Sequence, residues 1–250
     1  MVRKVPMPSH LLDLVSTARI LHFETAKTAF VELVAKIASS PCVLWDDDLQ
    51  PEARVTKAIM LDRSLMQFTR DLPVDYQYEE LLVSHEGPKS GWEAYGHTIH
   101  QYQHHHAARM WNACMVLRIK LQSVVHKTLS QLPPTEFPRP EDWMTALKQA
   151  EKEIAEAAAG ICANVPQILS PVAYDKIGIE VSHEARVATL LPSLSVIKAE
   201  PLVPSAMRGY ATDRLKHLGR EFRVSQADSA ATSNLGLDAI HSGFHMLYVY

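Results

Sequence analysis

Apolar residues recur at helical spacing along most of the chain. Ser9 is a suitable N-cap for an apolar pattern that continues to Ile37, so we expect one or two helices over residues 9–39. A second pattern begins at Pro51, a residue that suits the first turn of a helix, and continues to Leu72. Pro73 is expected to end that helix.

The second half of the chain has the same periodicity. Residues 94–132 contain no proline and present a broad apolar face, which predicts one long central helix. The next apolar stripe, from Trp143 to Ile161, has spacings of 4, 3, 4, 4 and 3 residues and predicts a helix ended by Pro166. Residues 172–203 are β-branched, but their prolines favour a short helix flanked by loops. A last helix is expected from about residue 205 to 226.

These patterns predict an all-α fold, a multi-helix domain around a long central helix at about residues 94–132. We expect one helical domain over residues 1–232 and an irregular tail over 233–250. Composition agrees, because 47% of the 250 residues are apolar, enough for a continuous core, and only nine are glycine. No apolar run is long enough for a membrane span, and residues 1–8 do not open an unbroken apolar segment, so neither membrane insertion nor secretion is expected.

Charge and cysteine content exclude several classes of function. A formal charge of −3 and a pI near 6.5 give no overall attraction to nucleic acid or to an anionic membrane. Cys42, Cys114 and Cys162 lie far apart and form no Cys-x-x-Cys pair, so neither a zinc ribbon nor a disulfide framework is expected. We interpret them as buried free thiols.

A histidine-rich segment is the sharpest local feature. His100 and His104 are four residues apart and would share one face of the predicted helix, which is the geometry that two zinc ligands need. Gln101 stands where a zinc-protease glutamate would be, and a third ligand is not evident. A half-exposed histidine cluster is therefore favoured over a metal site, with His100 and His104 kept as weak candidates.

Three other features are interpreted without chemistry. Residues 46–48 are aspartates, but their spacing does not match a magnesium-binding segment. Residues 87–90 read Gly-Pro-Lys-Ser without the earlier glycine and strand of a phosphate-binding loop. The last helix carries basic residues interleaved with Asp213 and Glu221, which favours a solvated face over nucleic-acid contact; they are Arg208, Arg214, Lys216, Arg220 and Arg223. No residue is expected to be catalytic, and no cofactor is expected.

Four segments follow one another in an order typical of one protein family. They are Leu61-Asp62 with Leu72-Pro73-Val74-Asp75-Tyr76-Gln77-Tyr78; Trp111-Asn112 with Leu117-Arg118-Ile119; Ile161-Cys162-Ala163-Asn164-Val165-Pro166; and Leu190-Leu191-Pro192 with Leu218-Gly219 and Val224-Ser225-Gln226-Ala227. Together they cover roughly residues 55–232. In this order they resemble the C-terminal regulatory region of fungal zinc binuclear cluster transcription factors. Asn164 replaces that family's usual serine.

The resemblance implies an all-α regulatory domain that acts in transcription, in the nucleus, through protein or small-molecule contacts. Its protein partners could include a DNA-binding transcription factor. The family's six-cysteine DNA-binding cluster is not found in this sequence, so no direct zinc-cluster contact with DNA is expected. Three alternatives stay open: a free-standing interaction or scaffold protein, which could act in the cytoplasm; a truncated or decayed relative of the family; and an all-α enzyme that uses a metal bound by His100 and His104.

Overall fold

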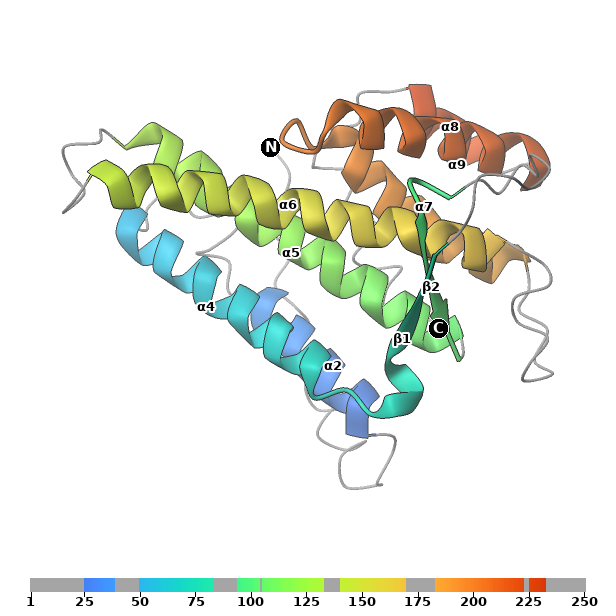
Figure 1. Cartoon of the computed structure of the whole chain (residues 1–250), viewed down its shortest axis with the longest axis horizontal. Coiled ribbons are helices and arrows are strands. Elements are labelled where there is room, and N and C mark those ends of the chain that lie inside the picture. The colour runs from blue at the N-terminus through green and yellow to red at the C-terminus, as the bar shows by residue number, and fades with distance from the viewer. Residues whose placement is uncertain are drawn as a thin grey trace. The chain divides into compact units, whose positions relative to one another are not determined.

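The computed structural model describes residues 25–38, 50–82, 94–103, 105–132, 140–169, 183–222 and 225–232. Helices dominate this part of the chain, and one small two-stranded sheet accompanies them (Figure 1). The predicted all-α fold is therefore confirmed. The expected tail over residues 233–250 lies outside the described residues.

The chain forms two compact units, whose boundaries fall within two long helices. The first unit contains α2 (Thr25–Ala38), α4 (Pro51–Arg70), the C-terminal half of α5 (His105–Gln131) and the N-terminal half of α6 (Pro140–Leu169). The second unit contains the remaining halves of α5 and α6 with the elements that follow: a 3-10 turn η1 (Val74–Tyr76), β1 (Tyr78–Leu82), β2 (Thr98–Tyr102), α7 (His183–Ala199), α8 (Ser205–Phe222) and α9 (Ser225–Thr232).

Helix–helix contacts build the first unit. Pro51 occupies the first turn of α4, as the sequence predicted, and the helix ends at Arg70, two residues before the expected Leu72. Aromatic rings pack α2 on α4, with 5.8 Å between the centroids of Phe30 and Phe68. The indole N–H of Trp143 donates to the Leu129 carbonyl over 2.9 Å, which ties the start of α6 to the end of α5.

In the second unit, α7, α8 and α9 pack against one another, and the two strands form an antiparallel pair. The register runs from Tyr78 opposite Tyr102 to Leu82 opposite Thr98. Fully buried leucines fill the contact between α7 and α8, as expected for helices that bury one apolar stripe each; they include Leu190, Leu194, Leu215 and Leu218. The Lys198 ammonium donates to the Ala230 carbonyl, which joins α7 to α9.

The central helix is shorter than predicted. Residues 98–102 form β2, and α5 begins only at His105, so the expected helix over residues 94–132 was wrong in its first third. Gly96 has a φ of +72°, a conformation that favours glycine, just before the strand. A lack of proline permits a helix but does not require one. Pairing with β1, 20 residues upstream, decides the conformation here.

Two prolines lie inside helices. Pro166 was expected to end its helix, but α6 continues to Leu169, and Pro192 lies within α7. An internal proline costs about 3 kcal/mol through a lost hydrogen bond and a steric clash. Val165, Ile168 and Leu169 are almost completely buried, and burial of each large apolar side chain contributes roughly 1.5–3 kcal/mol. Packing therefore offsets the local penalty in α6.

The remaining helix predictions hold with adjusted limits. The short helix expected within residues 172–203 is α7. The last predicted helix ends at Phe222 as α8, and a further helix, α9, begins at Ser225. No helix in the described ranges is both long and apolar enough to cross a membrane.

Two helical glycines give a matched test of packing. A Cβ at Gly209 in α8 would meet no atom within 4 Å, whereas a Cβ at Gly160 in α6 would lie 2.7 Å from Met115 Sδ. Gly209→Ala should therefore stabilise the protein by up to about 1 kcal/mol through helix propensity alone. Gly160→Ala should lose that gain because Met115 must move. Urea unfolding followed by circular dichroism measures both, and equal stabilisation by the two variants would contradict the packing at Gly160.

Candidate functional site

The structure describes only one of the two histidines proposed as metal ligands. His100 lies on β2, not on a helix, and its side chain is buried, whereas His104 lies outside the described residues. The shared helix face that motivated the zinc hypothesis is therefore absent at His100. Across the ranges that the structure describes, no group of three or more His, Cys, Asp or Glu side chains is placed to hold a metal ion. Residues 46–48, residues 87–90 and Arg223 fall outside those ranges.

His100 belongs instead to a polar cluster of the second unit. Its Nδ1 lies 2.8 Å from Asn164 Oδ1, and its ring stacks on Tyr78 with 3.9 Å between centroids. Because an amide oxygen can only accept, Nδ1 carries the proton in this contact. In the neutral ring Nε2 is then an acceptor, and it faces Glu80 Oε1 at 3.9 Å. Burial lowers the pKa of His100, while the hydrogen bond to Asn164 and the charge of Glu80 partly oppose that shift.

Asn164 is the centre of this cluster. Its side chain is fully buried, and its Oδ1 accepts a second hydrogen bond from the Tyr102 hydroxyl over 2.8 Å. Its amide nitrogen donates to Asn112 Oδ1 over 2.6 Å. One side chain of α6 thus bonds to two residues of β2 and to one residue of α5. We call Asn164, Asn112, His100 and Tyr102 the asparagine cluster.

Gln167, one turn further along α6, fixes the backbone of β2. Its Oε1 accepts from the Tyr102 N–H over 2.8 Å, and its Nε2 donates to the Tyr102 carbonyl over 2.9 Å. The side-chain amide therefore replaces a neighbouring strand on that edge of β2. Such buried polar bonds position elements uniquely because an unbonded buried group costs about 1–3 kcal/mol.

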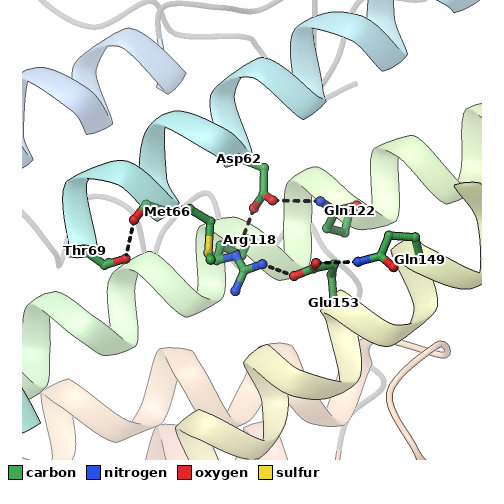
Figure 2. Close-up of polar contacts among 7 residues, drawn as sticks. All are labelled: Asp62, Met66, Thr69, Arg118, Gln122, Gln149 and Glu153. Carbon is green, nitrogen blue, oxygen red and sulfur yellow. Dashed lines mark hydrogen bonds and ion pairs between the residues drawn. The ribbon is translucent and has the colours of Figure 1, made fainter. Parts of the chain in front are cut away.

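A charged cluster occupies the first unit. Arg118 of α5 forms ion pairs with Asp62 of α4, at 3.0 Å from Nε to Oδ1, and with Glu153 of α6 (Figure 2). Gln122 donates to the other Asp62 oxygen over 2.9 Å, and Gln149 donates to Glu153 over 2.7 Å. The side chains of Arg118, Asp62 and Glu153 are 13%, 9% and 20% exposed. We call these three residues the arginine cluster.

Both clusters are suited to holding elements together. The arginine cluster joins three helices by pairing one cation with two carboxylates. The asparagine cluster joins β2, α5 and α6 through the hydrogen bonds of Asn164. Cys162 has a thiol whose pKa is raised to about 12 by burial, so it stays protonated. Cys114 and Cys162 are buried free thiols, as predicted, while Cys42 lies outside the described residues.

The basic residues of α8 form local contacts. Lys216 lies 3.5 Å from Asp213, and Arg214 sits over the Tyr210 ring at 5.2 Å from its centroid. Burial lowers the pKa of His217, and the nearby Arg214 and Arg220 lower it further against the opposing charge of Glu221. Two of these cations, Lys216 and Arg214, therefore interact with an acidic and an aromatic side chain of their own helix.

Sequence reasoning missed most of the polar residues that build the clusters. Asn112, Asn164, Gln122 and Gln167 are buried polar residues within helical segments that otherwise read as apolar. A polar residue on a buried helix face is a usable signal, since it needs a partner. The sequence does not reveal which residue that partner is.

Loss of Arg118 should strongly destabilise the first unit. Arg118→Ala leaves the buried Asp62 carboxylate without its cation, which costs about 3 kcal/mol or more. The double variant Arg118→Met with Asp62→Leu removes that unpaired charge and should recover much of the loss. Urea unfolding of the wild type, Arg118→Met, Asp62→Leu and the double variant gives the coupling energy. A single variant as stable as the wild type would contradict the role assigned to the ion pairs.

His100 should make stability depend on pH. Its folded pKa lies below the ordinary 6.5, so the unfolded chain binds this proton first as pH falls. The contribution of His100 to stability is therefore present above pH 6.5 and is lost as pH drops below it. His100→Gln removes this titration, so the variant should lose less stability than the wild type between pH 8 and pH 5. Parallel curves for the two proteins would rule out the effect.

Comparison of the chain with models of protein families, with curated proteins and with solved structures found no match. Function is therefore inferred from the contacts of the described residues and from the resemblance of the sequence segments.

Proposed function

We propose that this protein is a regulatory helical domain of the transcription-factor type, which acts through protein or small-molecule contacts without a DNA-binding zinc cluster of its own. One observation carries the proposal. Residues from separate segments of the resemblance to fungal zinc-cluster factors bond to one another within each unit. Contacts between these segments are what a fold shared with that family would require.

In the first unit, the segment Leu61-Asp62 meets the segment around Arg118. Asp62 accepts from the Arg118 guanidinium, and Leu61 is buried beside it in α4. Ile119, the next residue of the same segment, is completely buried. Both quoted segments therefore contribute their charged residues to the arginine cluster and their apolar residues to the core.

In the second unit, the Trp111-Asn112 segment contacts two others. The Trp111 indole donates to the Tyr76 carbonyl over 2.8 Å, in the segment that follows Pro73. Asn112 accepts from Asn164, which stands where the family usually has serine. An asparagine reaches further than a serine and carries its donor and its acceptor on separate atoms, so one residue can serve Asn112, His100 and Tyr102 together. The substitution thus fits the surroundings of Asn164.

A reporter assay tests this function directly. The chain is fused to an unrelated DNA-binding domain in a fungal reporter strain, with that domain alone as the reference. A regulatory domain should raise or lower reporter transcript relative to the reference. The Gly209→Ala fusion, altered at an exposed position, should behave like the wild type, whereas Asn164→Ala, which leaves three buried groups without their partner, should lose the response.

Localisation in the native host separates the regulator from the scaffold. The proposal expects nuclear enrichment of the tagged chain and a coherent set of changed transcripts after its deletion. A diffuse cytoplasmic signal, no transcript change and a silent reporter fusion would together reject the regulatory role and favour a scaffold protein.

A further inference from the structure

The two edges of the β1–β2 sheet differ in what covers them. On β2, both backbone groups of Tyr102 bond to the Gln167 side chain of α6, so that edge is closed at Tyr102. On β1, residues 79–82 are all exposed, and the Glu80 side chain is 64% accessible. In the described part of the chain the sheet contains only these two strands, which Figure 1 shows as paired arrows.

The bonds of Tyr102 also determine which groups of β1 face outward. Its N–H and carbonyl point to Gln167, away from β1, so Tyr102 and its partner Tyr78 are a non-hydrogen-bonded pair. Hydrogen-bonded and non-hydrogen-bonded residue pairs alternate along an antiparallel ladder. The backbone groups of Tyr78, Glu80 and Leu82 therefore point away from β2. The outer edge of β1 therefore offers a row of donors and acceptors to another strand.

The side chains along this edge are of a specific kind. Leu81 and Leu82 are 43% and 86% exposed, so two successive apolar residues are accessible on this strand. Glu79 and Glu80 precede them, and neither forms an ion pair with a lysine or arginine among the described residues. Two negative charges thus stand beside two exposed apolar side chains.

We infer that the outer edge of β1 binds an extended segment of a partner protein, which adds to the sheet as a third, antiparallel strand. Main-chain bonds would supply affinity and side chains specificity. Charge complementarity specifies the segment: two adjacent basic residues opposite Glu79 and Glu80, and two apolar residues opposite Leu81 and Leu82. The inference goes beyond the proposed function, because a regulator and a scaffold could both use this edge.

A second copy of this chain fits the edge less well. Antiparallel self-pairing centred on Glu80 would place this glutamate directly opposite its own copy. Parallel pairing in register would align both glutamates with their copies. Like charges directly opposite each other destabilise strand pairing, so these two registers disfavour self-association, whereas a basic partner meets attraction at both glutamates.

A synthetic peptide of sequence TIVRKVT provides the probe, because its order places basic residues opposite Glu79 and Glu80 in an antiparallel strand. Fluorescence anisotropy with the full chain should show saturable binding, and the matched peptide TIVEEVT should bind at least about tenfold more weakly, since attraction becomes repulsion at two positions. Nuclear magnetic resonance should show the largest amide shifts in β1. No binding of TIVRKVT to the wild-type chain would overturn the inference.

Two variants test the edge itself. Glu80→Pro removes an N–H that points away from β2, so the hairpin should persist while strand addition is blocked. Glu80→Gln, the matched control, removes only the charge and should weaken binding by less. Glu79→Lys should weaken binding because it reverses a charge on an exposed side chain, while every backbone hydrogen bond between the strands is kept.

Each result can be separated from misfolding and from self-association. Circular dichroism and thermal unfolding should match the wild type for Glu80→Gln and Glu79→Lys, which keeps the test valid if Glu80→Pro unfolds. Light scattering reports the oligomeric state. If the chain forms a dimer that Glu79→Lys abolishes, the strand that binds this edge comes from a second copy of the chain and not from a partner protein. If all three variants bind the peptide as the wild type does, the peptide binds elsewhere on the chain and the inference about the β1 edge is wrong.

Discussion

Asn164 imposes the constraint on which the second unit depends. A fully buried amide is stable only when its oxygen and nitrogen both find partners, and here those partners come from β2 and from α5. One turn later on α6, both ends of the Gln167 amide also find partners, in the backbone N–H and carbonyl of Tyr102. The hairpin is therefore held to α6 by bonds that have few alternative arrangements.

The first unit uses charge for the same purpose. Arg118 holds α4 and α6 to α5 through two carboxylates, and Gln122 satisfies the remaining oxygen of Asp62. Buried ion pairs add little net stability because desolvation offsets their attraction, but a missing partner is costly. We infer that such a cluster favours one packing of the three helices over its competitors.

These inward-facing networks define where interactions with other molecules can occur. His100, the described histidine of the proposed metal site, bonds to Asn164 and stacks on Tyr78. The outer edge of β1 is the contrasting case, with exposed leucines beside two glutamates. The proposed regulatory role, which acts through protein or small-molecule contacts, would use an exposed surface of this kind.

The sequence alone predicted the helices and most of their limits, because burial of an apolar stripe leaves a local period, as from Trp143 to Ile161. It did not predict β2, since a short strand depends on a partner 20 residues away. It also placed the end of α6 at Pro166, where distant packing outweighs a local penalty. The partners of Asn164 and Arg118 lie 35 to 64 residues away in sequence, so only the tertiary structure could decide them.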